Sequence, residues 1–103
     1  MLHLLQSEHF QPLLGQTCNL LLPDGSVLPV HIESIKDTPQ ARMPNSPRMP
    51  FCVELNSLAP TAFVDGLCDL ELPGVGHLQG MFVSRVPALG RDPTLGYFYI
   101  AFN

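Results

Sequence analysis

Apolar and polar residues alternate along most of this chain, which is the pattern of short, half-buried β-strands. In residues 51–56, for example, Phe51, Val53 and Leu55 share one face and polar or small residues share the other. Runs of the same kind occupy residues 17–22, 27–35, 67–72, 77–86 and 97–103. Six strands separated by turn residues predict an all-β fold, either a six-stranded antiparallel sandwich or a small, partly open barrel.

One short helix is predicted before the strands. Ser7 can cap its first turn, Gly15 can end it in a left-handed conformation, and Pro12 limits its length. The first hairpin is indicated by Asp24-Gly25, which separates two β-rich runs. Pro29 lies within the second of these runs, so we expect it at a sheet edge or a bulge.

A second hairpin is predicted around the turn at residues 73–76. In the run that follows it, Leu78, Phe82 and Val86 keep an even period, so we expect them to share one face. Gly80 interrupts this run, and glycine inside a strand marks a bulge or a close approach of another segment.

The last strand is the most aromatic segment of the chain. Phe98, Ile100 and Phe102 are predicted to face inward, whereas Tyr97 and Tyr99 face outward. A bare edge of this composition would be an aggregation hazard. We therefore expect the strand to pair on at least one side, with its own chain or with another subunit.

The loop at residues 37–50 has the most distinctive composition. Its prolines at 44, 47 and 50 recur every third residue, which is the repeat of a polyproline II segment, and the triplet Arg-Met-Pro occurs twice. Such a segment can be a surface connector, or it can dock onto a partner with cations and methionines beside the prolines. The predicted partner-binding residues of the chain are Arg42, Met43, Pro44, Pro47, Arg48, Met49, Pro50, Tyr97 and Tyr99.

Length and charge narrow the classes of protein. The 103 residues predict one domain, residues 1–103. A net charge of −4 with only five Lys and Arg residues argues against nucleic-acid binding. We expect a soluble, cytoplasmic protein, because no apolar run approaches a membrane span or a secretory signal. Three widely spaced cysteines predict free, mostly buried thiols rather than disulfides.

The sequence contains no recognisable catalytic, cofactor or metal motif. There is no G-x-S-x-G elbow, no C-x-x-C or H-x-x-x-H pair and no glycine-rich phosphate loop. Asp69 and Glu71 fall two residues apart in one run, where a solvated sheet face explains them. We therefore expect no enzyme, no cofactor and no metal site.

Short pieces spread over nearly the whole chain carry a family resemblance. These are Glu8-His9-Phe10, Leu14-Gly15, Asp24-Gly25, Phe51, Leu55, Ala59-Pro60 and Phe102-Asn103. With them the chain resembles a family of bacterial all-β domains of about this length whose function is not characterised. The resemblance implies an all-β fold without an established activity, and an association with phage-tail-like or surface-fibre proteins.

Together these features predict a non-enzymatic module that contacts another protein or a second copy of itself, as an assembly component or a small adaptor. The alternative is a β domain that binds a small molecule or a carbohydrate. A pocket lined by Tyr97 and Tyr99 with converging polar groups would favour the alternative, whereas an exposed apolar patch would favour assembly.

Overall fold

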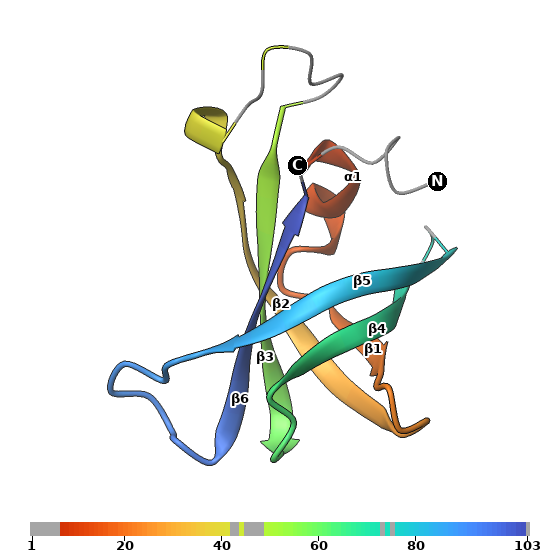
Figure 1. The fold of residues 1–103 in the computed structure, drawn as a ribbon, viewed down its shortest axis with the longest axis vertical. Coiled ribbons are helices and arrows are strands. Elements are labelled where there is room, and N and C mark those ends of the chain that lie inside the picture. The colour runs from red at the N-terminus through yellow and green to blue at the C-terminus, as the bar shows by residue number, and fades with distance from the viewer. Residues whose placement is uncertain (1–6, 42–43, 45–48, 73, 75, 103) are drawn as a thin grey trace.

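The protein folds as a closed barrel of six antiparallel strands in the order β1-β2-β3-β6-β5-β4. The computed structural model describes residues 7–41, 44, 49–72, 74 and 76–102. The strands are β1 (Thr17–Leu21), β2 (Val27–Asp37), β3 (Phe51–Pro60), β4 (Asp65–Leu72), β5 (Gly76–Val86) and β6 (Leu95–Phe102). Figure 1 shows them wrapping around a common interior. The predicted all-β fold is confirmed; of the two predicted architectures it is the barrel, which is closed and not partly open.

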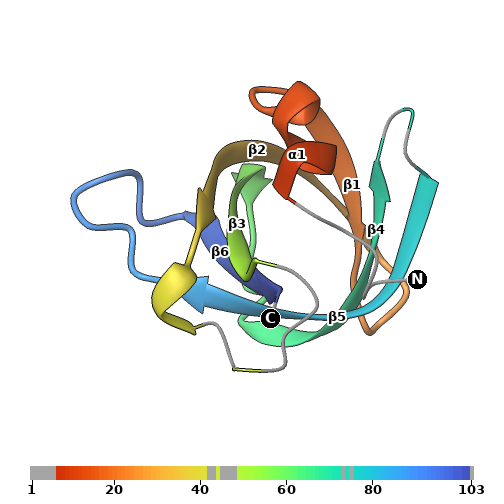
Figure 2. The same cartoon turned by 90° about the horizontal axis from the view of Figure 1, so that it is seen from above.

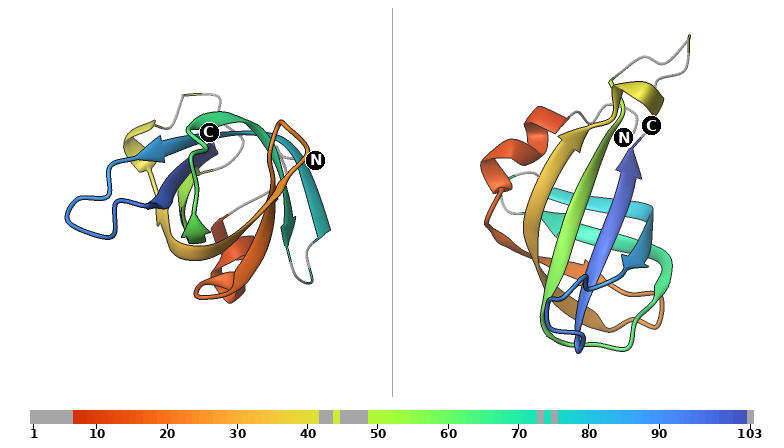
Figure 3. Two further views of the ribbon diagram at one scale, coloured as in Figure 1. Left: turned by 90° about the horizontal axis from the view of Figure 1, so that it is seen from below. Right: turned by 90° about the vertical axis from the view of Figure 1, so that its left-hand side faces the viewer.

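Two groups of strands make up the wall of the barrel. Figure 3 shows β2, β3 and β6 running side by side, while β1, β4 and β5 cross them. The barrel is closed where β1 pairs with β4 and where β5 pairs with β6. β6 therefore has a neighbour on each side within its own chain, which confirms that the aromatic last strand is paired.

The segment before the barrel is helical, as predicted, but it forms two short turns of different type and not one continuous helix. α1 (Ser7–Phe10) is one α-helical turn, and the 3₁₀ turn η2 (Gln11–Leu13) follows it. Pro12 lies within η2 and has no amide hydrogen to continue an α-helix, which explains the change. Gly15 has φ of 82°, as predicted for the residue that ends the helical segment.

α1 covers one end of the barrel (Figures 1 and 2). Its Phe10 is fully buried, and its ring lies 5.7 Å from that of Phe51 and 5.5 Å from that of Phe102. The latter two rings stack on each other at 4.7 Å. Because Phe51 begins β3 and Phe102 ends β6, these three rings join the helix to the strand ends at this opening.

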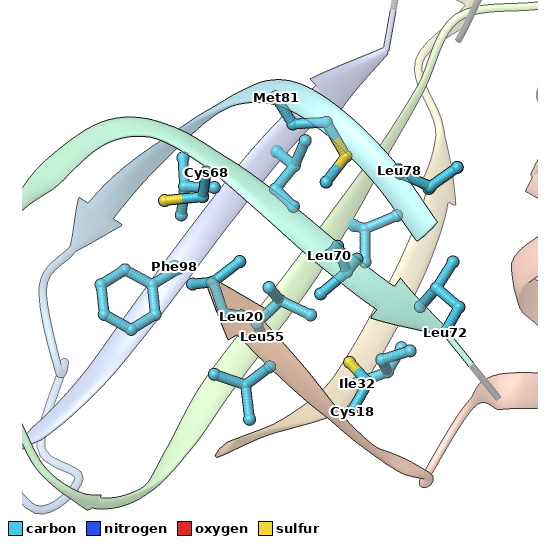
Figure 4. Packing of buried hydrophobic residues seen from close by; sticks show 14 of the residues in the cluster. Cys18, Leu20, Ile32, Leu55, Cys68, Leu70, Leu72, Leu78, Met81 and Phe98 are labelled. Atoms are coloured by element: carbon cyan, nitrogen blue, oxygen red, sulfur yellow. The ribbon is translucent and has the colours of Figure 1, made fainter. Parts of the chain in front are cut away.

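The interior is filled by the inward side chains of all six strands. Figure 4 shows Cys18 and Leu20 of β1, Cys68 and Leu70 of β4, and Phe98 of β6 pointing toward a common centre. These side chains are nearly inaccessible to solvent. A continuous apolar core of this kind supplies the main driving force for folding.

The predicted bulge in β5 is present, and it changes which side chains face the core. Cys68 pairs with Met81 but Leu70 pairs with Leu78, so β5 contains one residue more than β4 at this point. The expectation that Phe82 shares a face with Leu78 is therefore wrong. Leu78 is 6% exposed, whereas Phe82 is 57% exposed on the outside.

Prolines affect two other strands. Pro29 pairs with Asn19 of β1 and lies just before the β2–β3 ladder begins at Val30, so it has the predicted edge position. β3 continues to Pro60, four residues beyond the run of residues 51–56 that predicted it. The ladder is irregular between Asn56 and Pro60, which accommodates the proline.

Candidate interaction surface

The structure places three of the predicted partner-binding residues of the loop at residues 37–50. Pro44 is exposed and Met49 is 39% exposed. Pro50 is fully buried, and its carbonyl oxygen accepts a 2.7 Å hydrogen bond from the Thr38 amide. Pro50 therefore anchors the start of β3 and does not belong to an exposed edge. The other four, Arg42, Met43, Pro47 and Arg48, lie outside the described residues, so their role stays a prediction.

The two tyrosines of β6 are covered more than the sequence indicated. Tyr97 is 6% exposed, because the guanidinium of Arg91 lies 3.8 Å from its ring centroid. Arg91 is itself held by the carbonyl oxygen of Ala88 and by the carboxylate of Glu33, each at 2.8 Å. Tyr99 is half-buried. Neither ring forms an open platform, and their role in partner binding stays a prediction.

The described cationic side chains are already engaged within the chain. Lys36 forms an ion pair with Glu54 at 3.3 Å, and Arg91 forms one with Glu33. The Arg85 guanidinium donates hydrogen bonds of 2.9, 2.9 and 3.1 Å to the main-chain carbonyls of Thr61, Phe63 and Leu95. Arg85 thus ties the segment between β3 and β4 to the start of β6.

The clearest exposed apolar feature lies on β4 and β5. Leu67 is directly opposite Phe82 in the β4–β5 ladder, and the two side chains are 63% and 57% exposed. Side chains paired in this way lie about 5 Å apart at Cβ and act as one unit. Single exposed apolar residues are ordinary, but a paired leucine and phenylalanine on a sheet face form a local patch.

Carboxylates flank this patch along β4. Along β4, Asp65, Leu67, Asp69 and Glu71 alternate with inward residues, so all four project to the outside. We call these four residues together with Phe82 the β4–β5 outer face. Two of its carboxylates, those of Asp65 and Glu71, make no hydrogen bond or ion pair with the described residues. The face is acidic around an apolar centre.

Asp69 has a structural role at the bulge. Its Oδ1 accepts a 3.0 Å hydrogen bond from the Gly80 amide, and its Oδ2 lies 3.2 Å from Nε2 of His77. The hydrogen bond from Gly80 and the one with His77 lower the pKa of Asp69. The carboxylate is therefore ionised at neutral pH and fixed in place beside Leu67.

A hollow of about 600 Å³ lies next to this face, where β1, β4 and β5 meet. Asn19 pairs with Glu71, and Glu71 pairs in turn with His77, so these three residues form a row across the three strands. The hydroxyl-bearing Thr17 also lines the hollow. The hollow therefore presents several hydrogen-bond acceptors and a carboxylate to solvent.

A second hollow, of about 410 Å³, lies beside Tyr97. Its polar lining comes from Arg85, whose guanidinium is occupied by three carbonyl oxygens. The rest of its lining is mainly apolar and includes Pro87 and Pro93. Tyr99 does not line it, so this hollow is not shared by the two tyrosines.

The residues that could carry covalent or metal chemistry are dispersed. Cys18, Cys52 and Cys68 are free and buried, as predicted. Burial raises the pKa of Cys18 and of Cys68 to about 11, so these thiols are protonated at neutral pH. Among the described residues, no group of three or more His, Cys, Asp and Glu side chains is arranged to bind a metal. No helix in the described ranges has the length and apolarity needed to cross a membrane.

The fold and this surface define a small closed antiparallel β-barrel with an acidic, partly apolar outer face. Comparison with protein families shows that the chain belongs to the family DUF6916, a domain of unknown function, whose model matches residues 5–102. No curated protein and no solved structure matches the chain. The resemblance to a family without a characterised function is thereby confirmed over nearly the whole length.

The sequence did not predict the surface that the structure reveals. From the sequence we predicted partner binding at the loop of residues 37–50 and at the β6 tyrosines. The exposed apolar pair in the structure is Leu67 and Phe82. A signal for Phe82 was present, because the bulge inferred at Gly80 reverses the inward and outward positions beyond it. Applying that reversal would have placed Phe82 outside.

Proposed function

We propose that this domain is a non-enzymatic module that works by contact with another protein, as an assembly component or a small adaptor. The observation that carries the proposal is the exposed Leu67 and Phe82 pair on the β4–β5 outer face. Burying what remains exposed of these two side chains against a partner would contribute about 1–2 kcal/mol each. The setting implied by the family resemblance is an assembly such as a phage-tail-like or surface-fibre system.

Closure of the barrel favours contact through a face. Each of the six strands has a hydrogen-bonded neighbour on both sides, so no whole strand is left as an edge for another chain to extend. The bulge at Gly80 further interrupts β5, and bulges are one way in which proteins prevent strand addition. Self-association or partner binding would therefore use side chains, most directly those of Leu67 and Phe82.

A capture experiment from native lysate tests this proposal. The parent chain is compared with Leu67→Ser/Phe82→Ser, and Leu58→Ser serves as a matched control because Leu58 is 54% exposed on β3. All variants are first checked for equal thermal stability. We expect a partner, identified by mass spectrometry and confirmed with the purified protein, to be lost only by the double variant.

A further variant tests the predicted role of the loop at residues 37–50. In it serine replaces Arg42, Met43, Arg48 and Met49. If this variant alone loses the partner, the loop is the contact surface and the β4–β5 outer face is not. If every variant retains the partner, neither surface mediates contact and the proposal fails in its present form.

The second candidate function is binding of a small polar molecule or a carbohydrate. It is favoured by the hollow lined by Thr17, Asn19, Glu71 and His77, whose side chains can hydrogen-bond to hydroxyl groups. A thermal-shift screen of mono- and disaccharides, repeated with Asn19→Ala and Glu71→Ala, tests it. A ligand that stabilises the parent and neither variant would favour this function over protein contact.

A further inference from the structure

The order of outward residues along β4 places charge on both sides of an apolar centre. Asp65 precedes Leu67, while Asp69 and Glu71 follow it, at intervals of two residues along one face. Phe82 widens the apolar centre from the neighbouring strand. An extended segment lying along β4 would therefore meet carboxylates before and after a hydrophobic patch.

No described Lys or Arg side chain is paired with the carboxylates of this face. Lys36 and Arg91 are paired with other carboxylates, and the guanidinium of Arg85 is held by three main-chain carbonyls. Among the described residues, His77 is the basic side chain next to this face, and it is hydrogen-bonded to Asp69. At physiological salt, exposed charges interact over about 8 Å, so Asp69 and Glu71, which lie two residues apart on this face, reinforce each other.

The hollow beside Glu71 has the polarity of a site for a cationic side chain. Thr17, Asn19 and His77 line the same space as Glu71, whose carboxylate has no ion-pair partner among the described residues. Guanidinium and ammonium groups need several acceptors at once, because they carry up to five and three donors respectively. The volume of about 600 Å³ is ample for such a group.

We propose that the β4–β5 outer face binds an extended segment of a partner protein, in which Arg or Lys is separated by about four residues from a large apolar residue. The cation enters the hollow beside Glu71, and the apolar residue packs on Leu67 and Phe82. This inference rests on the proposed function and adds the chemistry of the partner to it.

The spacing follows from the geometry of β4. Glu71 lies four residues beyond Leu67, which is about 13 Å along a strand. An extended peptide covers that distance in about four residues. A second copy of this chain is disfavoured as the occupant of the face, because face-to-face contact would oppose the same three carboxylates. Nucleic acid and anionic lipid are disfavoured for the same electrostatic reason.

A synthetic peptide tests the chemistry directly. The probe carries Arg and Phe separated by a short Gly-Ser spacer that places them four residues apart, and its control carries Glu in place of Arg. Binding is followed by fluorescence anisotropy and by amide chemical shifts of the intact chain. We expect the Arg peptide to shift resonances of Asn19, Leu67, Glu71 and Phe82, and the Glu peptide to bind at least about tenfold more weakly.

Matched variants locate the two halves of the contact. Glu71→Gln is expected to weaken binding about three- to fivefold, as for a partly exposed ion pair. Leu67→Ser/Phe82→Ser is expected to weaken it at least about tenfold. The controls are Asp37→Asn, an exposed carboxylate at the end of β2, and Leu58→Ser on β3, neither of which should change the affinity.

Three results would overturn the inference. They are equal weakening by Asp37→Asn and Glu71→Gln, equal binding of the Arg and Glu peptides, and chemical-shift changes confined to another face. Each of these leaves the proposed function standing if the lysate experiment still shows a partner that depends on Leu67 and Phe82. If instead the peptide binds as expected but capture of the partner from lysate does not depend on Leu67 and Phe82, the proposed function is refuted.

Discussion

Phe10 gives the sharpest test of how the barrel is closed at one end. The side chain is fully buried, and its ring lies within 5.7 Å of Phe51 and 5.5 Å of Phe102. Replacing Phe10 with alanine removes the whole ring and leaves a cavity between α1 and the ends of β3 and β6. The surrounding strands are held by the barrel ladders, so the cavity can collapse only in part.

The expected loss can be estimated from these contacts. Phenylalanine-to-alanine substitutions in a core cost about 3–5 kcal/mol, including the cavity. A domain of this size has a total free energy of unfolding of about 5–15 kcal/mol, so the loss is a large part of it. With a urea m-value of about 1–3 kcal/mol per molar, the unfolding midpoint should fall by more than about 1 M.

Urea unfolding followed by far-ultraviolet circular dichroism measures this effect. Leu14→Ala is the matched control, because Leu14 follows η2 but is 48% exposed, and it should cost less than about 1 kcal/mol. Phe10→Leu retains most of the volume and keeps the test informative if the alanine variant does not fold. A loss below about 1 kcal/mol for Phe10→Ala, or one equal to that of Leu14→Ala, would refute the view that Phe10 closes the barrel.

Four further outcomes follow from the packing. Gly96→Ala should lower the free energy of unfolding, measured with urea, by about 1–3 kcal/mol, because a Cβ at this position overlaps the buried ring of Phe98. An unchanged urea midpoint would contradict this. Arg85→Lys should cost about 1–3 kcal/mol, since an ammonium cannot match the fork that contacts three carbonyls, and a stable lysine variant would show that these bonds contribute little. Cys18 and Cys68, whose pKa values burial raises to about 11, should react with a thiol reagent at pH 8 only after unfolding. The thiols ionise at lower pH in the unfolded chain than in the folded one, so their contribution to the free energy of unfolding should be complete below their ordinary pKa and should fall as the pH rises toward 11. A free energy of unfolding that stays constant over that interval would refute the raised pKa values.

The strands themselves could be predicted from the sequence because they depend on local alternation. In β6, every second side chain faces the core of the barrel, as the alternation indicates: Phe98, Ile100 and Phe102. The turn at Asp24-Gly25 joins β1 and β2, and Gly15 ends the helical segment. Local patterns did not distinguish a barrel from a sandwich, because that choice depends on which distant strands meet.

The surface was predicted less well because exposure depends on contacts between distant residues. Tyr97 has an outward position by its period, but Arg91 covers its ring after a turn of the chain that no local pattern specifies. Pro50 has the spacing of its neighbouring prolines, yet its side chain is buried at the start of β3. In both cases the spacing along the chain did not show that the side chain is covered in the fold.

The bulge at Gly80 connects the fold to the proposed contact surface. Its extra residue sends Phe82 outward, where it faces Leu67 across the ladder. The Gly80 conformation, with φ of 71°, is one that residues with a Cβ rarely adopt, and the Asp69 carboxylate accepts the hydrogen bond of its amide. The same carboxylate adds negative charge beside Leu67. One irregularity therefore interrupts β5 as a template for strand addition and creates the acidic, apolar face that we propose a partner binds.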